Sequence, residues 1–129
     1  MPSIFLSPSV QEYNPYITGG NEEQYMNLIA DEMVPYLEAS GIQVTRNNPD
    51  EPLSAAIEAS NAGSYDLHLA LHSNASPASL SGQLRGPDVY YYRGSSRGEA
   101  AATIYANNLK WIYPDPALIN IIPNVTLAE

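Results

Sequence analysis

The stretch that decides the fold of this chain is Asp66-Leu67-His68-Leu69-Ala70-Leu71-His72-Ser73-Asn74-Ala75, residues 66–75. Its first seven residues are almost continuously apolar, which is typical of a central parallel strand covered on both faces. The polar residues that follow predict a loop at the carboxyl end of that strand. The two histidines of the chain, His68 and His72, lie on this strand. Period-two alternation places them on one face, about 13 Å apart along the strand, which is too far to share one metal ion.

Helices and further strands alternate along the chain around this central strand. The other strands are expected at 4–6, 42–46 and 89–92, the helices at 21–41, 53–61 and 100–111, and a strand or turn at 118–122. Pro35 is expected to kink or interrupt the end of the first helix, because proline lacks an N–H group. This alternation predicts an α/β fold, a mostly parallel twisted sheet with helices on both faces. Functional loops then lie at the carboxyl ends of the strands.

Composition and charge predict a folded chain with one domain spanning residues 1–129 and exclude several classes of function. The chain has 44% hydrophobic residues and no cysteine, which excludes disulfides, thiol nucleophiles and cysteine-ligated metals. Five basic against 14 acidic residues give a net charge of −9, so nucleic acid and anionic membrane surfaces are not expected partners. No stretch approaches the roughly 20 apolar residues of a membrane span, and the N-terminus lacks the pattern of a signal peptide.

Glu22 and His72 are the candidates for chemistry. The apolar residues of the expected first helix are Met26, Ile29, Met33 and Leu37. Extending their stripe back by one turn reaches Glu22, whereas Glu23 points roughly 100° away. A carboxylate at the head of an apolar face needs a cation or a metal as partner if it is buried, and the alternative is a solvated acid that favours the helix dipole.

His72 lies at the carboxyl end of its strand, at the sheet edge to which the preceding loop delivers Glu22. A histidine and a glutamate at one strand edge form half of a plausible zinc site. The alternative is a strand-end histidine with structural hydrogen bonds only. His68, near the amino end of the strand, is expected to be a structural histidine with a hydrogen-bond partner nearby.

The sequence Gly94-Ser95-Ser96-Arg97-Gly98 matches the G-x-S-x-G pattern of a nucleophile elbow and lies between an expected strand and an expected helix. In hydrolases with that elbow a histidine follows the serine along the chain, and no histidine follows His72 here. A glycine and serine turn that caps the following helix is therefore the preferred interpretation.

Three segments together resemble the zinc-dependent N-acetylmuramoyl-L-alanine amidases of the amidase_3 type, which are cell-wall hydrolases of bacteria and phage endolysins. They are the opening strand with its sequel at 4–8, the helix start at 21–30, and the strand with the H-x-N-A tetrad at 65–75. The tetrad is the most specific of the three. The resemblance implies an amidase-like three-layer sandwich and a Zn²⁺ ion held by two histidines and a glutamate.

The resemblance also implies roles for individual residues. Glu22 matches the ligand glutamate and His72 the second ligand histidine, while Asn74 would orient the loop or the substrate. The stretch at 7–12, where the first ligand histidine is expected, holds no histidine, so Gln11 or Glu12 is expected to replace it through an oxygen atom. The family's general-base glutamate, on a late strand, is not found in this chain, and Glu129 is not assigned that role.

Two interpretations of the whole chain follow from the resemblance. In the first, the chain is a peptidoglycan hydrolase that uses zinc-activated water to cleave the amide bond between N-acetylmuramic acid and L-alanine, in the cell wall or outside the cell. In the second, it is a non-catalytic module that binds peptidoglycan or serves a structural role. The missing last strand indicates either a fragment of a longer protein or a domain that has lost it, and predicts self-association through an exposed sheet edge.

Overall fold

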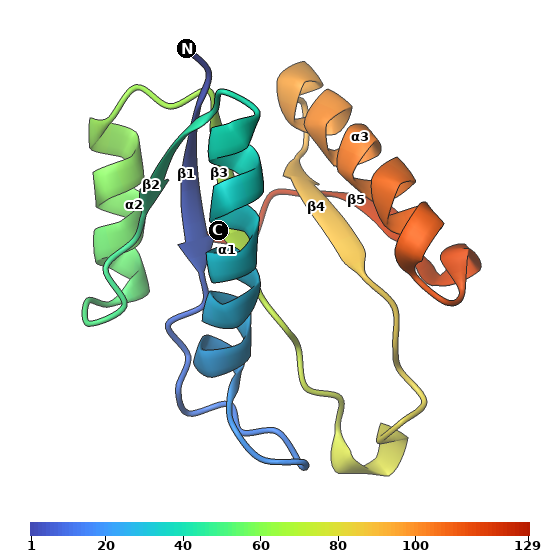
Figure 1. Cartoon of the computed structure of the whole chain (residues 1–129). Helices are drawn as coiled ribbons and strands as arrows, with labels where there is room; N and C mark the ends of the chain where they lie inside the picture. The colour runs from blue at the N-terminus through green and yellow to red at the C-terminus, as the bar shows by residue number, and fades with distance from the viewer. The chain divides into compact units, whose positions relative to one another are not determined.

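The structure is a computed structural model that describes all residues 1–129, and the chain forms two compact units. The first unit comprises residues 1–75 together with Glu129, and the second comprises residues 76–128. Parallel strands and helices build both units, which confirms the α/β class (Figure 1). The strands form two small sheets, one in each unit.

The first unit contains a parallel three-stranded sheet with the order β2-β1-β3. Its elements are β1 (Ser3–Pro8), α1 (Glu22–Ala39), β2 (Gln43–Arg46), α2 (Leu53–Ala62) and β3 (Leu67–Leu71). The central strand is β1, on which Phe5 and Leu6 are almost inaccessible. The stretch 66–72, expected to be the central strand, instead forms the edge strand β3, which is only half-buried because it pairs with β1 alone. A strand paired on both sides and covered on both faces must be apolar along its length, as 4–6 is.

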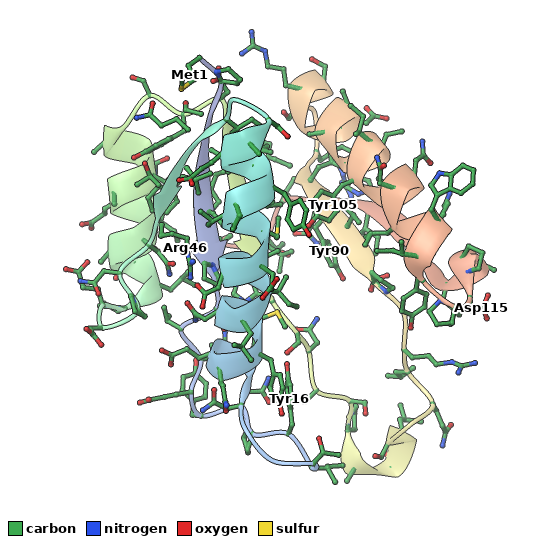
Figure 2. All side chains as sticks on the ribbon, in the orientation of Figure 1. Met1, Tyr16, Arg46, Tyr90, Tyr105 and Asp115 are labelled. Carbon is green, nitrogen blue, oxygen red and sulfur yellow. The ribbon has the colours of Figure 1, made fainter.

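Helices α1 and α2 cover opposite faces of this sheet. Leu6 pairs with Arg46, and the Arg46 guanidinium bonds to Asp31 and Asn27 of α1, so this is the α1 face (Figure 2). Neighbouring positions on a strand point to opposite faces. Phe5 and its register partner His68 therefore lie on the other face, where His68 bonds to a serine of α2. The first unit thus has the three layers expected from the sequence.

Helix α1 begins and ends as the sequence predicts. The Asn21 side chain accepts a hydrogen bond from the Gln24 N–H at 2.8 Å and caps the first turn. Gly41, with φ +78°, takes the left-handed conformation that closes a helix. The helix continues without interruption through Pro35. Ile29, expected on the buried stripe, is largely exposed, and the side chains that α1 buries are those of Glu22, Met26 and Ala30.

The second unit contains two parallel strands and one long helix. Its elements are the short 3-10 turn η1 (Ala78–Leu80), β4 (Asp88–Tyr92), α3 (Ser96–Ile112), the 3-10 turn η2 (Pro116–Leu118) and β5 (Asn120–Asn124). Strands β4 and β5 pair in parallel, so the segment expected as a strand or turn forms a strand. Helix α3 starts four residues earlier than expected and buries Ala102 and Ala106.

The G-x-S-x-G stretch is a helix cap. Gly94 has φ +93°, and the Ser95 Oγ accepts a hydrogen bond from the Gly98 N–H at 3.0 Å. Ser96, the serine of the pattern, is an exposed residue in the first turn of α3. The turn therefore caps the start of α3, which confirms the interpretation preferred from the sequence.

Removing this cap should destabilise the second unit. We expect Ser95→Ala to lower its free energy of unfolding by about 1 kcal/mol, because the Gly98 N–H loses its acceptor. Ser96→Ala, one residue away, should change it by less than about 0.5 kcal/mol. Urea titrations followed by the fluorescence of Trp111, the single tryptophan, measure both variants. Equal effects of the two substitutions would contradict the cap.

Candidate functional site

Glu22 and His72 lie in direct contact at the carboxyl edge of the three-stranded sheet. Glu22 is the first residue of α1, and His72 immediately follows β3. Glu22 Oε1 and His72 Nδ1 are 3.0 Å apart, and Glu22 is only 2% exposed. The fold thus brings together the two residues predicted from the sequence to carry chemistry, from positions 50 residues apart.

The Glu22 carboxylate is held by donors from two further segments. Asn14 Nδ2 donates to Oε2 at 2.7 Å, and the Ser73 N–H donates to Oε1 at 3.2 Å. Burial by itself would raise the pKa of Glu22, but the hydrogen bonds from Asn14, Ser73 and His72 outweigh it and leave the pKa below its usual range. Glu22 is therefore a carboxylate at neutral pH.

The loop between β1 and α1 fastens this carboxylate to the loop after β3. The Asn14 side chain also donates to the Ser73 carbonyl at 3.2 Å, and the hydroxyl groups of Tyr16 and Ser73 are hydrogen-bonded. The Tyr16 ring stacks on Tyr25, with centroids 4.9 Å apart, beside the start of α1 (Figure 2). Asn14 and Tyr16 were not singled out from the sequence, because no local pattern links positions separated by nearly 60 residues.

Glu129 is a second acid at this site, and no role was expected for it from the sequence. Its side chain is 1% exposed and lies between the two histidines. Oε1 is 2.7 Å from His68 Nε2, and Oε2 is 3.1 Å from His72 Nε2. Burial alone would raise the pKa of Glu129, but the hydrogen bonds with His68 and His72 outweigh it and lower the pKa to about 2.

His72 is placed between two carboxylates, one at each ring nitrogen. The hydrogen bond with Glu129 is the main cause that raises the pKa of His72, burial opposes it, and the bond with Glu22 adds to the increase. In the metal-free chain the ring therefore keeps a proton on both nitrogens to a higher pH than an ordinary histidine does. About 28% of its side chain remains exposed.

An acidic cleft of about 460 Å³ opens beside His72. The β1–α1 loop, the first turn of α1 and the β2–α2 loop line it, and no lysine or arginine does. Its carboxylates belong to Glu12, Glu23, Asp50 and Glu51. Such a lining accepts hydrogen bonds from amide, hydroxyl or ammonium groups and repels anions. A ligand in this cleft would reach the exposed edge of His72.

The other residues named from the sequence are not in contact with the pair. Gln11 and Glu12 line the cleft, but neither side chain hydrogen-bonds to Glu22 or His72. Asn74 is an exposed loop residue. His68 has structural partners as expected, with Nδ1 2.7 Å from the Ser60 Oγ, although its partners are Ser60 and Glu129 rather than the nearby Asp66.

The donor atoms at this site fit part of a zinc centre. A tetrahedral zinc ion with bonds of about 2.0–2.2 Å holds two ligand atoms about 3.3 Å apart. The 3.0 Å between Glu22 Oε1 and His72 Nδ1 is close to that separation. No group of three or more histidine, cysteine, aspartate or glutamate side chains is arranged for a metal ion. Glu22 contacts the Nδ1 edge of the His72 ring, and Glu129 contacts the Nε2 edge. One metal ion bound to a single nitrogen of His72 therefore cannot also bind both carboxylates.

Comparisons with known proteins add no relative: no protein-family model, curated protein or solved structure matches the chain. None of its helices has the length and apolar character needed to cross a membrane. The resemblance to the amidases therefore remains a prediction from the sequence.

Proposed function

We propose that this chain is a zinc-dependent peptidoglycan hydrolase that cleaves the amide bond between N-acetylmuramic acid and L-alanine, in the cell wall or outside the cell. The observation that carries the proposal is the contact between Glu22 and His72 at the carboxyl edge of the sheet, beside an open cleft. In α/β sheets this edge is where ligands bind. The H-x-N-A tetrad and the helix start that resemble the amidases are the segments that supply these two residues.

Glu22 and His72 would hold the metal. A zinc ion there supplies a Lewis acid for the scissile carbonyl and for a water molecule. Glu22 contributes a carboxylate that is ionised at neutral pH and fixed by Asn14 and Ser73. The cleft beside His72 would take the peptide side of the substrate, whose amide N–H groups can donate to the carboxylates that line it.

Digestion of purified peptidoglycan tests this proposal. We expect the full chain with zinc to release new N-terminal L-alanine, detected by labelling of free amino groups and mass spectrometry of the products. His72→Ala and treatment with a chelator should both abolish the release. Sedimentation of the chain with peptidoglycan, without new L-alanine termini, would instead favour the non-catalytic wall-binding module.

A further inference from the structure

Helix α1 carries an open, mostly apolar groove of about 520 Å³ beside the stripe that it buries against the sheet. Two rows of side chains, each spaced by four residues, form its walls: Leu28, Glu32 and Tyr36 in one row, and Ile29, Met33 and Leu37 in the other. Leu28, Ile29 and Tyr36 are 52%, 46% and 76% exposed. Contiguous apolar surface of this kind on a folded chain marks an interaction site.

The spacing of the two rows matches the packing surface of another α-helix. Side chains four residues apart form ridges along a helix, and the groove between two such ridges receives a ridge of a neighbouring helix. Residues 28–37 extend over about 13.5 Å at 1.5 Å per residue, which is between two and three helical turns. The occupant that fits this groove is therefore a helix with an exposed apolar ridge of similar length.

The charge of α1 adds a second requirement. The helix contains five acidic residues and no lysine or arginine. Glu32 stands in one wall of the groove, is exposed, and forms no ion pair within the chain. A helix that enters the groove should therefore carry a basic residue beside its apolar ridge, since complementary charges select the partner and its register.

Helix α3 has both features. Ile104, Asn108 and Ile112 are exposed, follow one another at intervals of four residues and form a ridge about 12 Å long. Ile104 and Ile112 are 65% and 79% exposed. Arg97 lies two turns before Ile104, on the same face of the helix, and forms no ion pair within the chain. The α3 ridge thus matches the α1 groove in length, apolar character and charge.

We propose that the α1 groove of one copy of this chain receives the α3 ridge of a second copy, with Ile104 between the two rows and Arg97 facing Glu32. The two surfaces differ, so the contact is head to tail, and such contacts either close into a ring or extend from copy to copy. The net charge of −9 on each copy opposes the approach, but salt at physiological strength screens it beyond about 8 Å. The contact uses neither Glu22 nor His72, so it is independent of the proposed function.

Sedimentation equilibrium of the full chain, between about 10 µM and 1 mM, tests the proposal. We expect the wild-type chain to associate in this range. Leu28→Asp and Ile104→Asp should each weaken the association roughly 30-fold or more, because each places a charge in the apolar contact. Each variant loses one surface and keeps the other. An equimolar mixture of the two should therefore form a dimer, in which the intact groove of one variant receives the intact ridge of the other.

Ile17→Asp is the matched control. Ile17 is an exposed apolar residue outside both surfaces, and its substitution adds the same charge, so this variant should associate as the wild type does. A wild-type chain that stays monomeric up to about 1 mM would overturn the inference. Association that persists in both Leu28→Asp and Ile104→Asp would also overturn it and would place the contact elsewhere, for example at the free edge of β3.

An exchange of charges provides a second measurement that leaves the apolar contact intact and so guards against poor folding of the aspartate variants. Glu32→Arg and Arg97→Glu should each weaken the association at least about 10-fold, because like charges then face each other. A mixture of the two variants should recover the wild-type affinity, since the groove of the first and the ridge of the second again carry opposite charges. A mixture that associates no better than either variant alone would overturn the inference.

Discussion

Glu22→Ala is expected to remove zinc from the chain, whereas Glu23→Ala leaves the zinc content unchanged. The two glutamates are neighbours in the first turn of α1, but Glu22 is buried against His72 while Glu23 is half-buried at the cleft. Residues that hydrogen-bond to a metal ligand without touching the metal change its affinity by up to roughly 100-fold when they are lost. Loss of a direct ligand should lower the zinc affinity by more than that. His72→Ala should have the same effect as Glu22→Ala.

Elemental analysis after removal of loosely bound metal measures this result, and circular dichroism confirms that each variant is folded. About one zinc per wild-type chain is expected. Because the two glutamates have the same charge and adjacent positions, the comparison cancels general electrostatic effects of the acidic surface. Loss of zinc in Glu23→Ala alone would show that Glu23, and not Glu22, holds the metal.

The metal-free first unit is expected to be most stable between about pH 4.5 and 6.5. The pKa of Glu129 is lowered to about 2, so its contribution is complete above the unfolded-state value near 4.5 and is lost as the pH falls toward 2. The pKa of His72 is raised, so its contribution is complete below the unfolded-state value near 6.5 and is lost as the pH rises above it. Protonation of Glu129 alone should lower the free energy of unfolding by an amount on the order of 3 kcal/mol.

Urea unfolding in the presence of a chelator, at a series of pH values, measures this dependence. Backbone signals of β1 and β3 in nuclear magnetic resonance spectra report the first unit, while Trp111 reports the second. Glu129→Gln should weaken both limbs of the profile, because it removes the contribution of Glu129 to the acid limb and one of the two partners that raise the pKa of His72. A stability that keeps rising from pH 6 to 9 would contradict the arrangement.

The layers and the edge of the sheet could be predicted because their signals are local. The apolar run at 66–72 predicts a strand there, and Asn21 followed by two acids predicts the start of α1. The same run also predicts a central position, which is wrong, because β3 is a half-buried edge strand and β1 is the central one. The exposure of Ile29 shows the limit of this reasoning. Periodicity identifies the apolar side of a helix, but the neighbouring strands decide which part of that side is covered.

The sequence by itself determined that the chain alternates helices with parallel strands, and that Glu22 and His72 end at one edge of a sheet. Only the tertiary structure decided that Glu129 lies between His68 and His72, and that Asn14 holds Glu22. Helix and strand periods act over a few residues, so they direct a side chain to a face or an edge. Glu129 meets His72 across 57 residues of chain, and no local preference encodes such a contact. It forms because a buried carboxylate and two imidazoles, one on β3 and one directly after it, must each find a polar partner when the chain packs.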